Sequence, residues 1–224
     1  MPTVYNQNKN LTLYNHNQYR NHQVQLARGP VFEEYLEINH QVIDRAIETQ
    51  SKTFVVVLSV YFPAHWSLAQ RLKRDHYSRM IESLKSQMKA FDDRAKKNGN
   101  YRPNRLRFIR TVEIGEQNQG LHAHMALIFD GNVYRNLGDS DSGLMNMWWR
   151  INFAWASALN LLVGELDGLI HISKQYYIDQ REKEKYKVKA SRQVNDLLRH
   201  LSYFCKADTK HYGLGLRVYS PSRG

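Results

Sequence analysis

The sequence predicts one α+β domain in which helices pack on one face of an antiparallel β-sheet. Three observations predict this class: an apolar, β-branched run at residues 53–62, two strand-like runs at 106–115 and 121–129 joined by a short polar loop, and helical apolar spacing around them. The resulting order of helix, strand, helix, hairpin, helix, strand and helix is typical of α+β proteins. We expect the second face of the sheet to be free to carry a functional site.

The first 30 residues are expected to form a loosely ordered arm. They are rich in Asn, Gln and Tyr, show little apolar periodicity and end at Gly29-Pro30. A solvated tail and an arm that lies along DNA remain equal alternatives for this segment. Residues 31–224 make up the predicted domain, which begins with a helix at 31–49 whose apolar positions have helical spacing: Phe32, Tyr35, Leu36, Ile43 and Ile47.

The middle of the chain contains the predicted central strand, a long helix and the hairpin. The run at 53–62 has the composition and length of a buried strand. Ser67 is a suitable N-cap for one helix that extends to Lys97, because apolar residues recur along this stretch at helical intervals. The hairpin follows at 106–129 and ends at an Asp-Gly turn.

The last third of the chain is predicted to be mainly helical. Residues 144–162 form a strongly apolar helix, whose three tryptophans we expect in the core rather than on a base-stacking surface: Trp148, Trp149 and Trp155. A short strand at 169–172 precedes a charged run at 179–193, which is typical of a solvated face or linker. A final helix is expected at 193–206.

The charge balance indicates nucleic acid as the partner. Lys and Arg number 32 against 21 Asp and Glu, which gives a formal charge of +11. No stretch reaches the roughly 18 apolar residues of a membrane span, so we expect no membrane partner. The single cysteine, Cys205, cannot form an intrachain disulfide and fits a reducing cytoplasm, and residues 1–25 lack an apolar signal-peptide core. We therefore expect a cytoplasmic protein.

A metal site is predicted at the hairpin. His122 and His124 lie on one face of their strand because alternate side chains point the same way. If Gly115 pairs with Gly120, Glu113 lies directly opposite His122, with Cβ atoms roughly 5 Å apart. Two histidines and one carboxylate leave open positions and suit Mg²⁺ or Mn²⁺ as well as Zn²⁺. Glu116 remains the alternative third ligand, since a small slip in register would change the carboxylate that faces the histidines.

A tyrosine near the C-terminus is the predicted nucleophile. On a helix, Tyr203 shares a face with Arg199 and Lys206. A free tyrosine, with a pKa of roughly 10, is about one part in a thousand ionised at neutral pH, so it needs nearby cations or a metal to act as a nucleophile. The alternative is a tyrosine that packs with its apolar neighbours. Cys205 is expected to be a packed residue rather than a catalyst.

Several segments resemble known proteins. FVVVLSV at 54–60, LHAHMALIF at 121–129 and YFCK at 203–206 resemble, in this order, the three motifs of the HUH replication initiators, and VEIGEQNQGLHAH at 112–124 resembles their metal-binding segment. FAWASAL at 153–159 and HLSYFCKADTKHYGLGLRVYSPSRG at 200–224 are similar to inovirus-type replication proteins and their prophage YagK/YfjJ relatives. The resemblance covers roughly residues 50–224.

The resemblance implies an HUH endonuclease fold with an RRM-like palm, and it assigns roles to the site residues. His122, His124 and Glu113 would bind a divalent metal, Mg²⁺ or Mn²⁺. Tyr203 would be the single nucleophile and Lys206 would position or activate the phosphate. Asp208 is a further residue that would assist near the metal.

Further residues are expected to contact DNA. Four cations are candidates for contacts with backbone phosphates, which make binding salt-dependent without reading sequence: Arg199, Lys210, Arg217 and Arg223. The adjacent Tyr176 and Tyr177 are candidates for stacking on bases.

The implied activity is that of a single-strand DNA nickase and ligase that starts rolling-circle replication of a phage, prophage or plasmid in a bacterial host. Its partners would be single-stranded DNA or an origin hairpin, with a host helicase and polymerase. A transposase or relaxase that uses the same chemistry is one alternative. A non-catalytic nucleic-acid-binding regulator is another, and a metal hydrolase that activates water is a third.

Overall fold

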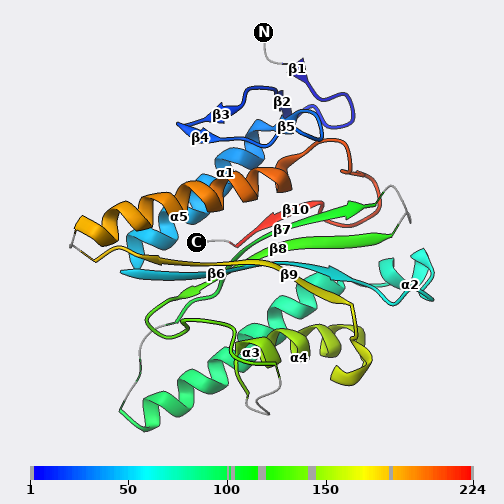
Figure 1. Cartoon of the computed structure of the whole chain (residues 1–224). Coiled ribbons are helices and arrows are strands. Elements are labelled where there is room, and N and C mark those ends of the chain that lie inside the picture. Colours follow the sequence, from blue (N-terminus) through cyan, green and yellow to red (C-terminus); the bar gives the residue numbers. More distant parts are fainter. Residues whose placement is uncertain are drawn as a thin grey trace.

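A five-stranded antiparallel sheet forms the centre of the molecule (Figure 1). The computed structural model describes residues 3–99, 101, 104–115, 120–140, 145–181 and 184–222. The strands lie in the order β10, β7, β8, β6, β9, with these bounds: β6 Lys52–Tyr61, β7 Arg107–Ile114, β8 Leu121–Asp130, β9 Ile170–Asp179 and β10 Tyr219–Pro221. The α+β class predicted from the sequence is confirmed.

Helices cover both faces of this sheet, not one face as predicted. Helices α3 and α4 lie against one face, and α1 and α5 lie against the other (Figure 1): α1 Glu33–Thr49, α3 His76–Lys97, α4 Met147–Leu159 and α5 Glu184–Ser202. The central strand β6 explains the difference. Val56 and Leu58 pack with α3 and α4, whereas Val55 and Val57 pack with α1 and α5, so its consecutive apolar residues need cover on both sides.

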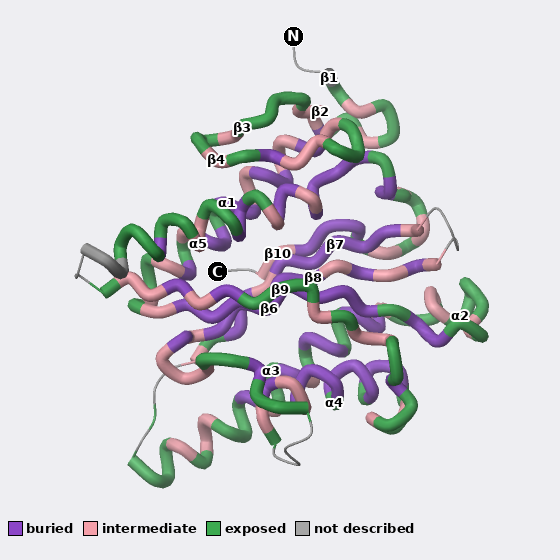
Figure 2. The backbone as a smooth tube through the Cα atoms, viewed as in Figure 1, coloured by how far each residue is buried: buried purple, intermediate pink, exposed green. Residues whose placement is uncertain are grey.

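Burial follows these layers. Figure 2 shows the central strands buried along most of their length, while the outer surface of α5 and the far end of α3 are exposed. Trp155 is fully buried in the core between α3, α4 and the sheet, and Trp148 packs against that core, as predicted. Trp149 is half-buried and stacks on the exposed Phe153, with ring centroids 4.9 Å apart.

The N-terminal segment is an ordered layer rather than a loose arm. Its short strands are β1 Thr3–Val4, β2 Thr12–Tyr14, β3 Gln18–Tyr19, β4 His22–Gln23 and β5 Val31–Phe32. Leu11 and Val24 are buried, and the Gln25 backbone N–H donates to Ser202 Oγ over 2.9 Å. Through these buried residues and this hydrogen bond, the segment packs on α1 and on the end of α5.

The predicted helix from Ser67 to Lys97 is two helices. Ser67 caps only α2 (Leu68–Leu72), and α3 begins after Asp75, whose side chain accepts a hydrogen bond from the Ser78 N–H. Asp75 also binds the buried Arg110 at 3.0 Å. This ion pair with β7 holds the chain at the break between α2 and α3. The local sequence contains no Gly or Pro there, so it does not indicate a break.

Two further elements differ in length from the prediction. Strand β9 continues to Asp179 and is ten residues long, because it pairs with β6 along almost its whole length. Helix α5 begins at Glu184, so most of the charged run is helical. Within it, residues 187–189, 191 and 192 are exposed, whereas Ala190 is buried. Short 3-10 turns, η1 (Val163–Glu165) and η2 (Tyr203–Cys205), complete the fold. None of the described helices is long and apolar enough to span a membrane.

Candidate active site

The hairpin of β7 and β8 brings two histidines and a glutamate together on the α5 side of the sheet. Glu113 pairs with His122 across the hairpin, which is the register predicted from the sequence, and the Gly115 N–H donates to the Gly120 carbonyl over 3.2 Å. One ligand atom from each of Glu113, His122 and His124 lies within 4.8 Å of the others. The three side chains could therefore bind one ion.

Neighbouring groups orient both imidazoles. His122 Nδ1 lies 3.0 Å from the Gly120 carbonyl oxygen, which can only accept, so Nδ1 carries the proton and Nε2 keeps its lone pair. The Tyr61 ring stacks on the His122 ring at 5.3 Å. Burial, together with the nearby His124, lowers the pKa of His122 and favours the neutral form that binds metals.

Ser59 orients the second histidine. It lies opposite His124 in the pairing of β6 with β8, and its Oγ is 2.7 Å from His124 Nδ1. In the tautomer that carries its proton on Nδ1, this contact leaves Nε2 available, and Nε2 lies 3.5 Å from Glu113 Oε2. The sequence reasoning missed Ser59, although a polar residue in an otherwise apolar strand was a usable signal.

Two lysines hold the buried carboxylate of Glu113. Lys206 Nζ lies 2.8 Å from Oε2 and Lys210 Nζ lies 2.7 Å from Oε1, and Glu113 itself is 1% exposed. Burial alone raises the pKa of this carboxyl, but the nearby His124, Lys210 and Lys206 lower it well below its usual range. The pair with Glu113 raises the pKa of Lys206 against the opposing effect of its own burial. The carboxylate therefore remains charged, as a metal ligand must be.

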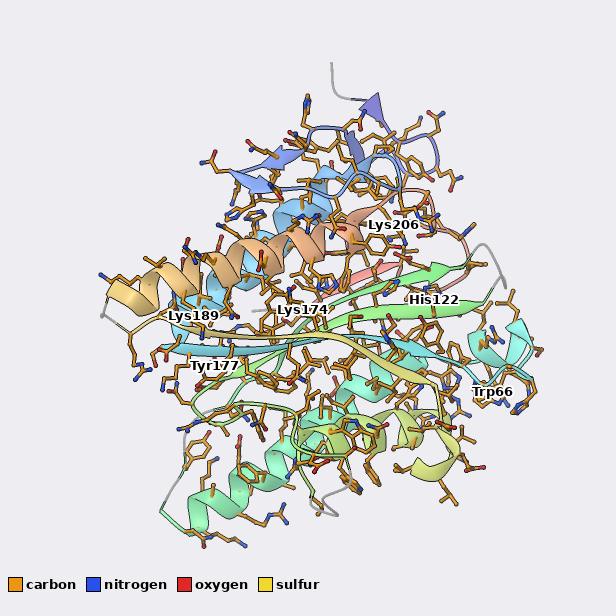
Figure 3. All side chains as sticks on the ribbon, viewed as in Figure 1. Trp66, His122, Lys174, Tyr177, Lys189 and Lys206 are labelled. Atoms are coloured by element: carbon orange, nitrogen blue, oxygen red, sulfur yellow. The ribbon has the colours of Figure 1, made fainter. Side chains whose placement is uncertain are left out.

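Tyr203 lies beside this cluster. It begins the 3-10 turn η2 directly after α5, is half-buried, and has its ring centroid 5.9 Å from that of His124. Lys206 Nζ lies 3.9 Å from the Tyr203 ring centroid. Figure 3 shows Lys206 at the same end of the sheet as His122. One lysine thus contacts both the predicted nucleophile and the predicted metal ligand Glu113.

Buried contacts with α1 and β5 fix the turn that carries Tyr203. Asn39 on α1 donates to the Leu201 carbonyl over 3.0 Å and to Cys205 Sγ over 3.1 Å. Val31 forms an isolated β-bridge with Lys206. Cys205 is completely buried, and burial raises the pKa of its thiol to about 12, so it is a packed residue, as predicted. No local sequence pattern indicated the role of Asn39.

The four residues predicted to contact phosphates differ in exposure. Arg199 is exposed on α5 beside the N-terminal layer, and Arg217 is exposed just before β10. Lys210 has no exposed side-chain surface and binds Glu113, so its predicted contact with a phosphate at the surface is wrong in this arrangement. Arg223 lies outside the described residues, as does Glu116, the alternative metal ligand.

The remaining candidates are not at the cluster. Asp208 is exposed and does not belong to the metal-binding group found among the described residues. Tyr176 is 3% exposed, with its hydroxyl 3.1 Å from His200 Nδ1, and the Tyr177 hydroxyl donates to the Gly131 carbonyl over 3.0 Å. Burial of Tyr176 is incompatible with the stacking on bases that its sequence position indicated.

Comparisons with known proteins identify the family. The family model described as the YagK/YfjJ C-terminal domain matches residues 14–222. The protein named "Uncharacterized protein YagK" from Escherichia coli (strain K12) is 32% identical over 151 residues, which are 65% of this chain and 68% of that protein. No solved structure matches the sequence significantly. Because the family model covers nearly all of the sheet, the helices and the site, the chain belongs to the YagK/YfjJ C-terminal domain family.

Proposed function

We propose that this chain is a metal-dependent HUH endonuclease that nicks and rejoins single-stranded DNA through Tyr203. One observation carries the proposal: a tyrosine directly after α5 lies against a group formed by the buried Glu113 and two half-buried histidines, with its ring 5.9 Å from that of His124 and 3.9 Å from the Lys206 ammonium. A tyrosine that only packs in the core does not need this surrounding. The resemblance of the three sequence motifs to HUH replication initiators supports the same reading.

The donor set fits a divalent ion. Glu113 Oε2 is buried and has no well-oriented hydrogen bond, although it lies within ion-pair distance of Lys206 and faces His124. The Lys206 ammonium is the nearest positive charge to this oxygen, and an ion bound by Glu113 and the histidines would share the oxygen with it. Two imidazole nitrogens and a carboxylate oxygen suit Mn²⁺ or Mg²⁺ with open positions for other ligands. A bound ion would supply polarisation of a phosphate oxygen.

The proposed step exchanges one phosphoester for another. Tyr203 Oη loses its proton to solvent and attacks the phosphorus; the bond from phosphorus to the 3′ oxygen breaks, and that oxygen leaves as a 3′-hydroxyl after taking up a proton. The product is a 5′-phosphotyrosyl DNA. Lys206, which touches the Tyr203 ring, offsets the negative charge that gathers on tyrosine and phosphate. Because no phosphoester is lost, the reverse reaction rejoins the strand.

The proposed setting is rolling-circle replication of a phage, prophage or plasmid in a bacterial cytoplasm. A host polymerase would extend the free 3′-hydroxyl, a helicase would open the duplex, and the enzyme would rejoin the displaced strand. This setting rests on the resemblance to replication initiators, whereas the chemistry rests on the site. Transposition and conjugative transfer use the same chemistry, and the neighbouring genes would distinguish them.

The proposal is tested with purified protein, Mn²⁺ and labelled single strands that tile the replicon encoding the chain. A 3′-labelled strand is expected to give a labelled protein adduct that survives denaturation, because the protein stays on the 5′ end of the downstream fragment. A 5′-labelled strand is expected to give a free fragment that a polymerase extends.

Matched variants decide between the readings. Tyr203→Phe is expected to abolish the adduct, whereas Tyr14→Phe, which removes a hydroxyl bonded to the Gln18 carbonyl in the N-terminal layer, is expected to retain it. Cleavage that survives Tyr203→Phe would identify a metal hydrolase. Binding of the tiled strands without adduct or cleavage would identify a non-catalytic binding protein.

A further inference from the structure

A groove lies on the opposite side of the sheet from the candidate active site. It has a volume of about 610 Å³ and runs between α3, the start of β7 and the end of β10; we call it the α3–β10 groove. Phe108 lines it and packs towards the α3 side, whereas the adjacent Ile109 packs on the α5 side. Neither Tyr203 nor the metal-ligand residues line this groove.

The lining of the groove is strongly basic. Five cationic side chains line it against two carboxylates, those of Asp92 and Asp93; the cations are Lys85, Lys89, Lys96, Arg105 and Arg217. Asp93 lies 3.3 Å from the Lys89 ammonium and 4.0 Å from that of Lys96, and Glu82 lies 2.8 Å from that of Lys85. Pairs this exposed contribute little to stability, and they leave excess positive charge facing the groove.

Aromatic rings accompany these cations. Tyr101 is 39% exposed and lies under the Lys96 ammonium, 4.4 Å from it. Phe108 is half-buried, and the Lys85 ammonium is 6.0 Å from its ring centroid. Cations for phosphates combined with rings for unpaired bases are typical of surfaces that bind single strands, whereas a duplex keeps its base faces stacked inside. A groove that only needed solvation would not require the exposed Tyr101 ring among its lysines.

The C-terminal segment connects this groove with the active site. It carries Lys206 and Lys210 to Glu113 on one side of the sheet and then Arg217 to the groove on the other. Along β7, Phe108 and Glu113 are five positions apart, which corresponds to roughly 17 Å. A single strand that passes round the β10 edge could therefore reach both places.

We propose that the α3–β10 groove binds a second segment of single-stranded DNA, distinct from the segment whose phosphate reaches Tyr203. The choice of DNA rests on the proposed function; the preference for an unpaired strand rests on the exposed Tyr101 ring and the half-buried Phe108 ring that line the groove. The groove would hold the flanking strand while the nicked end stays at the metal site.

Binding of labelled oligothymidine of about 30 nucleotides, long enough for both sites, tests this proposal. Fluorescence anisotropy is measured over a range of salt concentrations in EDTA, so that no nicking occurs. The triple variant Lys89→Gln/Lys96→Gln/Arg217→Gln is expected to lower the slope of log affinity against log salt by about 2, since each phosphate contact on a single strand contributes roughly 0.7. Tyr101→Ala, which changes no charge, is expected to weaken binding by about fivefold or more, as loss of one stacked base does.

A second triple variant controls for overall charge. Lys73→Gln/Lys187→Gln/Lys189→Gln removes three exposed cations away from the groove and is expected to change the slope less. Equal effects of the two triple variants would overturn the proposal. Binding of a labelled duplex is measured in the same way. The proposal would also be overturned if the groove triple variant bound the duplex more weakly while Tyr101→Ala had no effect on binding, because that result would indicate a duplex-binding site. The measurement needs no adduct, so a failure of the proposed nicking activity would be seen separately.

Discussion

The residues grouped around Glu113 have partners that determine their chemistry. Ser59 holds His124 through a contact of 2.7 Å, and Tyr61 stacks on His122. Groups behind metal-binding histidines fix the ring and its tautomer. Ser59 and Tyr61 on β6 lie opposite His124 and His122 in the register of the sheet. They therefore hold both imidazole rings in position.

Ser59→Ala is expected to weaken Mn²⁺ binding about tenfold or more, because the His124 ring loses the partner that sets its tautomer. Titration followed by electron paramagnetic resonance measures the affinity. Ser51→Ala, on an exposed serine just before β6, serves as the control and is expected to bind Mn²⁺ like the parent. Equal affinities of the Ser59 variant and the parent would show that this contact does not support a metal site.

Lys210 forms a buried ion pair that its sequence position did not indicate. Its ammonium is fully buried and 2.7 Å from Glu113 Oε1. Lysine is almost never fully buried unless it has a charged partner. From the sequence alone, Lys210 was therefore expected at the surface, where it could contact a phosphate. Only the tertiary arrangement, which folds residues 206–210 over β7, reveals the ion pair.

Lys210→Met is expected to destabilise the fold by about 3 kcal/mol, because removing one partner of a buried pair leaves the other charge poorly compensated. Urea unfolding at neutral pH measures the free energy of unfolding. Lys187→Met, at an exposed position of α5, is expected to change it by less than about 0.5 kcal/mol. If the two variants were equally stable, the buried pair would not be part of the folded state.

At the scale of elements, the position of Tyr203 depends on how α5 ends. The helix stops at Ser202, and Asn39 binds the last turn through the Leu201 carbonyl and Cys205 Sγ while it accepts a hydrogen bond from the Tyr219 hydroxyl. Three elements are thus joined by one buried amide. Such a network fixes geometry when every group in it is satisfied.

Asn39→Ala is expected to lower the free energy of unfolding by about 2 kcal/mol or more, because it leaves buried polar groups without partners. It is also expected to slow adduct formation by Tyr203 while affinity for single strands stays close to that of the parent. Tyr14→Phe is again the control for an unrelated hydrogen bond. An Asn39 variant with parental stability and adduct rate would contradict the role assigned to this network.

The N-terminal layer is attached to α1 through aromatic and imidazole contacts. The His40 ring on α1 lies 5.0 Å from that of His22 and 5.4 Å from that of Tyr19. Burial, followed by the electrostatic effects of the nearby His22 and Arg20, lowers the pKa of His40 to about 4. The folded state therefore binds a proton at His40 less readily than the unfolded chain, in which the pKa is about 6.5.

Because its pKa is lowered on folding, His40 supports stability fully above pH 6.5, and this support is lost as the pH falls towards 4. The parent is expected to lose up to roughly 3 kcal/mol of unfolding free energy over this range through His40. His40→Asn should remove that part of the pH dependence, whereas His65→Asn, at an exposed position, should not. Identical slopes in the parent and the His40 variant would contradict the assignment.

How much the sequence predicted depends on the range of the interactions involved. The strands β6, β7 and β8, the hairpin register and the grouping of His122, His124 and Glu113 follow from local sequence pattern and a short loop, and the structure has them close to the prediction. The break before α3 depends on the long-range pair of Asp75 with Arg110, so local pattern did not reveal it. The ordered N-terminal layer likewise depends on surfaces of α1 and α5 that no local pattern describes.

For the molecule as a whole, the two-sided cover of the sheet is the main correction. The apolar residues of β6 face both ways, and α5 lies over the same face as the histidines without covering their end of the sheet (Figure 1). The candidate active site therefore lies where the cover ends and η2 begins. The α3–β10 groove lies on the opposite side of the sheet, against α3.

The proposed nicking reaction joins Tyr203 covalently to DNA beside the group of His122, His124 and Glu113. Its most direct test is mass spectrometry of the denaturation-resistant adduct after digestion with nuclease and protease. We expect a nucleotide joined through its 5′-phosphate to the peptide that contains Tyr203, and loss of this product on chelation of divalent metal. A nucleotide on any other residue, or an adduct that forms equally well without metal, would contradict it.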